Sequence, residues 1–146
     1  MRDGGRKQEA IEFHWDVDEH LCDGEGRGGV HERLLAIPPD EIGIPTVVLF
    51  ELMTGLVKNP GANKQRAELH TLANMVHLLA FDAHAAQESA VLRATLEAEG
   101  ARIGPYDTLI AGTALAHGAV LITRNTREFS RVPGLRCENW FSKDTP

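Results

Sequence analysis

Two patterns of apolar residues alternate along this chain. Short apolar runs, typical of buried strands, are separated by longer segments in which apolar side chains recur every three or four residues, as in helices. The predicted strands cover residues 11–16, 42–44, 76–81 and 120–123, and the predicted helices cover residues 30–37, 46–58, 64–74, 83–99 and 105–117. Because strands separated by helices favour a parallel sheet, the sequence predicts an α/β fold, a three-layer α/β/α sandwich with a central parallel sheet.

Polar and glycine residues mark the ends of several predicted helices. Thr46 is available to cap the helix that begins there, and Asp82 can cap the helix that follows the strand at 76–81. Gly100 and Gly118 each follow a helix and can end it. The strand at 76–81 is expected to be buried. The helix at 83–99 is expected to bury an apolar stripe made of Val91, Leu92, Leu96 and several alanines.

The composition suits one soluble domain. The chain has 146 residues, of which 42% are hydrophobic and 25% are charged, enough for a single core. We expect the domain at residues 11–141, a flexible segment at 1–10 and a short tail at 142–146. No membrane span and no export signal stand out, so the two cysteines, Cys22 and Cys137, are expected to be free thiols of a cytoplasmic protein.

Three isolated acids lie in apolar surroundings. Glu51 shares its helical face with Val47, Val48, Thr54 and Gly55, with no basic residue in reach. An ionised carboxylate there is costly unless a partner such as a divalent cation stabilises it. The alternative is that Glu51 lies on an exposed rim of the helix.

The other two acids also have simpler explanations. Asp107 can stabilise the first turn of its helix, and Asp16 can begin a turn after its strand. Carboxylates that are far apart in sequence can nevertheless meet at the carboxyl edge of a parallel sheet. Together with Glu51, these acids therefore predict a site for Mg²⁺ or Mn²⁺, which prefer oxygen ligands and support phosphodiester hydrolysis.

Charge is unevenly distributed. The formal net charge of −6 argues against a protein that simply coats nucleic acid, because phosphate affinity comes mainly from lysine and arginine. It does not exclude a metal-dependent nuclease. Between residues 120 and 137, one acid, Glu128, stands among four arginines, Arg124, Arg127, Arg131 and Arg136. An ordinary solvated surface is the alternative interpretation of this basic segment.

Several motifs resemble the PIN-domain ribonucleases of the VapC toxin type. The resemblance is strongest in GPYDTLIAGTALAHG and LITRNTREFSRVPGL, and it continues upstream in the helix VVLFELMTG. It implies that Asp16, Glu51 and Asp107 are the family's acidic metal ligands. The family's fourth acidic position falls on Asn125, which would orient water.

The resemblance also implies a function. We expect a Mg²⁺-dependent endoribonuclease toxin of a VapBC-type toxin–antitoxin module, cleaving RNA by metal-activated water, with Mn²⁺ as a possible substitute ion. Thr123, Arg124 and Arg127 would contact the RNA, although this polar turn could instead cap the short helix that follows it. The expected partners are RNA, a cognate antitoxin and a second copy of the chain. The apolar segments 49–57 and 69–79 are candidate surfaces for the two protein contacts.

The first third of the chain departs from the family pattern. Asp18 stands where the family usually has Asn, and glycines interrupt the segment that follows. We expect Asp18 to supply part of the charge that Asn125 lacks. The alternative function is a catalytically weak or inactive PIN-like module that acts by binding protein or RNA. A less favoured reading is a nuclease for DNA or for structured RNA.

Overall fold

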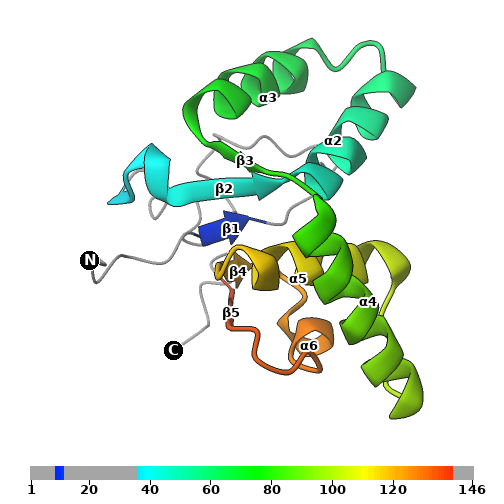
Figure 1. The fold of residues 1–146 in the computed structure, drawn as a ribbon. Helices are drawn as coiled ribbons and strands as arrows, with labels where there is room; N and C mark the ends of the chain where they lie inside the picture. The colour runs from blue at the N-terminus through cyan, green and yellow to red at the C-terminus, as the bar shows by residue number, and fades with distance from the viewer. Residues whose placement is uncertain (1–8, 12–35, 140–146) are drawn as a thin grey trace.

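The computed structural model describes residues 9–11 and 36–139. In chain order the elements are β1 (Glu9–Ile11), the 3-10 turn η1 (Pro39–Glu41), β2 (Ile42–Pro45), α2 (Thr46–Lys58), α3 (Asn63–Met75), β3 (His77–Leu79), α4 (Ala83–Ala98), α5 (Pro105–Ala116), β4 (Val120–Ile122), α6 (Thr126–Phe129) and β5 (Cys137–Glu138). The strands form one parallel sheet in the order β3-β2-β1-β4-β5 (Figure 1). This arrangement confirms the predicted α/β fold.

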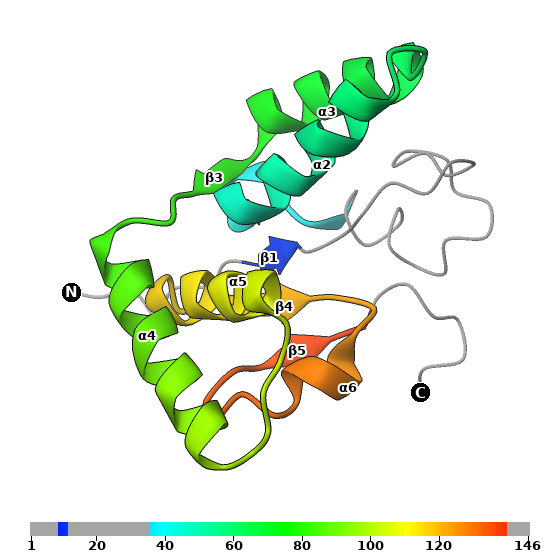
Figure 2. The same ribbon diagram turned by 90° about the vertical axis from the view of Figure 1, so that its right-hand side faces the viewer.

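The sheet register places the strand ends together. Ala10 of β1 pairs with Gly43 of β2 on one side and with Leu121 of β4 on the other. All strands run in the same direction, so the segments that leave their carboxyl ends gather at one edge. Figure 2 shows α2 and α3 lying side by side beyond β3, while α4 and α5 pack together on the other side of the view.

The core is formed by the sheet and the inner faces of the helices that pack on it, among them α2, α4, α5 and α6. Its fully buried members come from both strands and helices: Ile44, Val48, Leu52, Leu96, Ile110, Leu121, Ile122 and Phe129. Removing such side chains from water is the main favourable contribution to folding. None of the helices in the described ranges has the length and hydrophobicity needed to cross a bilayer.

The predicted helix ends are mostly confirmed. Asp82 caps α4, because its Oδ1 accepts a hydrogen bond from the N–H of Ala85 at 3.0 Å. Gly100 and Gly118 have φ values of +66° and +62°, a backbone conformation that glycine adopts without strain. Thr46 does not cap α2, contrary to prediction. Its Oγ1 accepts a hydrogen bond from the N–H of Phe81 instead, at 3.1 Å.

Two expectations about burial are wrong. His77 and Leu78 of β3 are exposed and only Leu79 is buried, because β3 is an edge strand of the sheet. Val91 of α4 is 61% exposed, whereas Leu92 and Leu96 are buried as predicted.

The first strand, β1, ends at Ile11 and begins two residues before the expected start of the domain. Residues 12–16 of the predicted strand lie outside the described residues.

Candidate active site

The carboxylates of Asp107 and Glu128 meet in a side-chain hydrogen bond. Asp107 lies in the first turn of α5, and Glu128 lies on α6, which follows the carboxyl end of β4. A Cβ placed on Gly104 would lie 3.5 Å from Asp107 Oδ2 and 3.7 Å from Glu128 Oε2. The two acids, 21 residues apart in the chain, therefore face the same point of the backbone.

Neighbouring groups orient Glu128. The N–H of Gly104 donates a hydrogen bond to Glu128 Oε2 at 3.0 Å, and Asn125 Nδ2 donates to Oε1 at 3.4 Å. The hydrogen bond with Asp107, followed by the one from Gly104, lowers the pKa of Glu128 from its usual value. Both oxygens of this carboxylate are thus held in defined directions.

The paired carboxylates suit a hard cation. Two carboxylates in hydrogen-bond contact must share a proton, because two ionised groups at this separation repel each other. Mg²⁺ and Mn²⁺ can take the place of that proton, since carboxylate oxygens are the ligands they prefer. Asp107 and Glu128 therefore fit a divalent metal ion as oxygen ligands.

Glu51 lies on α2, near the helix that carries Asp107. Its side chain is half-buried and its Oε1 is shielded from solvent, which differs from the alternative of an exposed rim. The aromatic rings of Phe50 and Tyr106, the residues that precede Glu51 and Asp107, pack with their centroids 5.9 Å apart. This contact joins α2 to the start of α5 beside the two acids.

Of the three predicted metal ligands, the structure describes Glu51 and Asp107. Within residues 36–139, no group of three or more His, Cys, Asp or Glu side chains converges closely enough to hold a metal ion. Glu51 is therefore not clustered with Asp107 and Glu128 in this conformation. Asp16 and Asp18 lie outside the described residues.

The polar turn after β4 is built around Thr123. This residue is fully buried, and its Oγ1 accepts a hydrogen bond from the N–H of Asn125 at 2.9 Å. Thr123 therefore helps to shape the turn, and its contact with a substrate stays a prediction. Asn125 contacts Glu128 through its amide nitrogen, at 3.4 Å.

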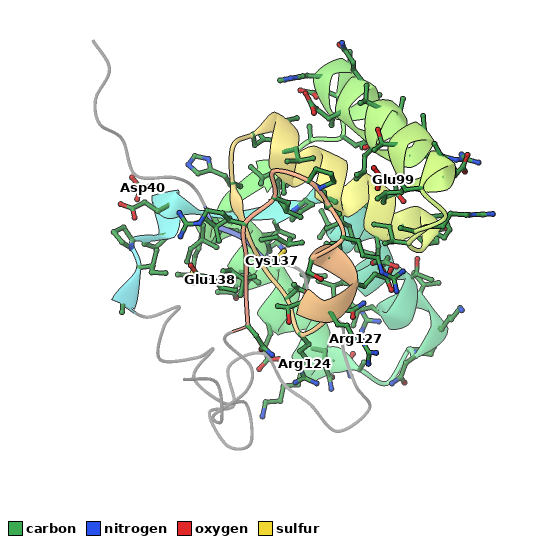
Figure 3. The ribbon with its side chains drawn as sticks, turned by 90° about the horizontal axis from the view of Figure 1, so that it is seen from below. Asp40, Glu99, Arg124, Arg127, Cys137 and Glu138 are labelled. Carbon is green, nitrogen blue, oxygen red and sulfur yellow. The ribbon has the colours of Figure 1, made fainter. Side chains whose placement is uncertain are left out.

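The arginines of the basic segment differ in their surroundings. Arg124 and Arg127 are exposed and lie on the same side of α6 (Figure 3). Arg136 pairs with Glu138 at 3.8 Å, and Arg131 donates to the carbonyl oxygen of Arg102 at 3.0 Å.

Glu128 is a candidate site residue that the sequence did not single out as a metal ligand. Its position in a charged stretch, next to Arg127, resembles a solvated surface. The available signal was that Glu128 is the only acid among four arginines and lies three residues after Asn125, just beyond a strand end. In the structure the Glu128 carboxylate contacts that of Asp107.

Comparison with known proteins supports the family that the motifs suggest. The PIN domain family model matches residues 19–135, a range that begins after Asp16. A "tRNA(fMet)-specific endonuclease VapC" from Shigella flexneri is 39% identical over 97 residues, covering 66% of this chain and 74% of that protein. "Ribonuclease VapC2" from Rickettsia felis is 36% identical over 99 residues, covering 68% of this chain and 74% of that protein.

Solved structures agree with these relatives. A chain of the DNA-bound VapBC structure from Salmonella typhimurium superposes with a TM-score of 0.76 at 29% identity, covering 92% of this chain and 99% of that chain. A chain of VapBC2 from Rickettsia felis, bound to a promoter DNA fragment, gives a TM-score of 0.70 at 32% identity, covering 77% of this chain and 85% of that chain. The chain thus belongs to the PIN domain family, and within that family it is of the VapC toxin type.

Proposed function

We propose that this chain is a Mg²⁺-dependent endoribonuclease toxin of a VapBC-type module. The observation that carries the proposal is the contact between the Asp107 and Glu128 carboxylates at the start of α5, in a chain of the VapC type. The names of two relatives, an endonuclease specific for tRNA(fMet) and a ribonuclease, support RNA as the substrate.

Four acids are proposed to serve the ion. Asp107 and Glu128 would hold it directly, and Glu51 and Asp16 would add oxygen ligands. When bound, the ion neutralises phosphate charge and lowers the pKa of the attacking water. No side-chain nucleophile is needed for this chemistry.

The other polar groups have supporting roles. Gly104 and Asn125 hold Glu128 in position through their N–H groups, and the side-chain oxygen of Asn125 is proposed to orient water. Arg124 and Arg127 would bind the phosphate backbone of the RNA, contacts that position the strand without reading its sequence. An RNA substrate would place the activity in the cytoplasm.

The proposed protein partners are an antitoxin and a second copy of the chain. The structural relatives named VapBC support an antitoxin. On α2, the exposed side chains of Phe50, Met53 and Val57 border an apolar groove of about 440 Å³. Exposed apolar patches of this kind commonly mark protein contacts. The expected surface at 49–57 is therefore accessible in the isolated chain.

An RNA cleavage assay tests the enzymatic proposal. The parent protein should cleave RNA with Mg²⁺ and not with EDTA, and Glu128→Gln should reduce the rate by at least about 100-fold. Glu99→Gln is the matched control, because Glu99 is exposed at the end of α4. Cleavage of a matched DNA strand at the same rate as RNA would contradict the substrate assignment.

One observation favours the alternative of a weak or inactive module. The family model matches only from residue 19, so Asp16 lies outside the matched range. Titration with Mg²⁺ or Mn²⁺, followed by thermal shift, separates the two functions, since an ion that binds only the folded state raises the melting temperature. A protein that is not stabilised and does not cleave RNA would support the binding module.

A further inference from the structure

Two hydrogen bonds join the loop before α5 to the end of α6. The N–H of Gly104 donates to Glu128 Oε2 at 3.0 Å, and Arg131 Nη1 donates to the carbonyl oxygen of Arg102, also at 3.0 Å. The N–H of Arg131 also donates to the carbonyl oxygen of Glu128 at 3.2 Å, which places Arg131 one turn after Glu128. The loop and the helix are therefore tied at two neighbouring points.

The two bonds depend on different parts of the sequence. On the loop, both partners are backbone groups, namely the N–H of residue 104 and the carbonyl of residue 102. On the helix side, both partners are side chains. A guanidinium that donates to a carbonyl oxygen makes a charge-assisted hydrogen bond. Arg131 is thus the side chain that holds the loop against α6. The loop in turn keeps the N–H of Gly104 in hydrogen-bond contact with Glu128.

We infer that Arg131 is a positioning residue for the acidic pair: by holding residues 102–104 against α6, it keeps the Gly104 N–H on Glu128 and so keeps Glu128 beside Asp107. The consequence for metal binding rests on the proposed function. Arg131 itself does not contact the ion or the RNA in this role. Groups that orient metal ligands commonly change metal affinity by about 10- to 100-fold when they are removed.

If Arg131 acted only through its charge, removing it would strengthen metal binding rather than weaken it. Arg131 is a positive charge close enough to Glu128 to lower its pKa, so it repels a cation bound at the same carboxylate. Removing its charge without any change of geometry should therefore tighten metal binding. Loss of the hydrogen bond that positions the loop should weaken metal binding. The sign of the change in affinity separates the two explanations.

The test compares Arg131→Gln with Arg102→Gln. Both changes remove one positive charge from the same pair of segments, but Arg102→Gln keeps the backbone carbonyl that accepts the hydrogen bond. Mn²⁺ binding to the full-length protein without RNA is measured by electron paramagnetic resonance. We expect Arg131→Gln to weaken Mn²⁺ binding by about 10-fold, the low end of that range, because Arg131 is exposed. Arg102→Gln should leave it unchanged or slightly tighter.

The variant Arg131→Lys and melting curves without metal control for a general loss of structure. Arg131→Lys keeps one donor and should recover part of the Mn²⁺ affinity, which a general loss of structure would not allow. The melting temperatures of the metal-free variants should agree with that of the parent. Mn²⁺ binding by Arg131→Gln that equals or exceeds that of the parent overturns the inference.

Cleavage of RNA distinguishes this inference from the proposed function. With the parent active, Arg131→Gln should need more Mg²⁺ for half-maximal cleavage but approach the parent rate at saturating Mg²⁺. A parent that binds Mn²⁺ but does not cleave RNA would contradict the proposed function, and the positioning role would then still be decided by the Mn²⁺ affinities.

Discussion

Ser89 of α4 and Gly112 of α5 lie in direct contact where the two helices pack together. A Cβ on Gly112 would come within 2.8 Å of the Cα of Ser89, a conflict that rotating the Ser89 side chain cannot relieve. Both residues are buried. The missing side chain at position 112 therefore sets how closely α4 approaches the helix that carries Asp107.

Replacing Gly112 by alanine should destabilise the protein. Because the added methyl group must push backbone away in a packed interface, we expect a loss of about 1–3 kcal/mol in the free energy of unfolding. Gly55→Ala is the matched control, since a Cβ there meets nothing within 4 Å on an exposed part of α2. It should stabilise the protein by up to about 1 kcal/mol, as alanine favours a helix over glycine. Urea denaturation measures the free energies of unfolding of both variants. A Gly112→Ala variant as stable as Gly55→Ala would contradict the prediction.

Local signals in the sequence predicted much of the fold. Thr46–Lys58 forms a helix with the predicted bounds, because its apolar spacing is clear and Asn59-Pro60 ends it. Asp82 also caps the predicted helix. These features depend on interactions between residues that are close in the chain.

Features that depend on the order of strands were not predictable in the same way. The segment 76–81 has the apolar character of a buried strand, yet β3 is at the edge of the sheet and exposes His77 and Leu78. Sequence periodicity does not say which strand is at the edge.

The partner of Asp107 was missed for a similar reason. Only the packing of α6 beside the start of α5 brings Glu128 next to Asp107. The pattern of residues around each acid does not indicate that the two will be in contact.

Changing Glu128 to glutamine should separate metal binding from folding. Glutamine can donate a hydrogen bond to Asp107, so it removes the close contact between two acids. The melting temperature without metal should therefore equal or exceed that of the parent. The increase in melting temperature caused by Mg²⁺ or Mn²⁺ should be lost. Thermal shift at several ion concentrations measures both effects, and a metal-dependent increase equal to that of the parent would remove Glu128 from the ligand set.

Asn125 should have a smaller effect on cleavage than the acids. Its contact with Glu128 is long, at 3.4 Å, so removing it should leave Glu128 held by Gly104. We expect Asn125→Ala to lower the cleavage rate by less than about tenfold, with a modest increase in the Mg²⁺ requirement. Asn125→Asp tests the opposite case, in which the family's usual acid is restored. A rate for Asn125→Ala as low as that for Glu128→Gln would make Asn125 a direct participant in the reaction.

The cap at the start of α4 should make part of the stability depend on pH. The hydrogen bond from Ala85 is the main cause that lowers the pKa of Asp82 from its usual 3.8, against an opposing effect of desolvation, and the electrostatic interactions with His117 and His84 act in the same direction as the hydrogen bond. Because the folded state lowers this pKa, the carboxylate stabilises the protein above the unfolded-state value. That contribution is lost as the pH falls through the folded-state value.

Asp82→Ala should therefore lower the melting temperature at neutral pH, and its difference from the parent should stay nearly constant down to about pH 5 and shrink as the pH is lowered further to about 2.5. Asp82→Asn keeps an oxygen that can accept the Ala85 hydrogen bond, so it should retain more stability at neutral pH but lose the pH dependence of the cap. Asp40→Ala, at another exposed carboxylate, controls for the change in net charge. If the Asp82→Ala difference stayed constant over this pH range, the capping bond would not depend on the charge of Asp82.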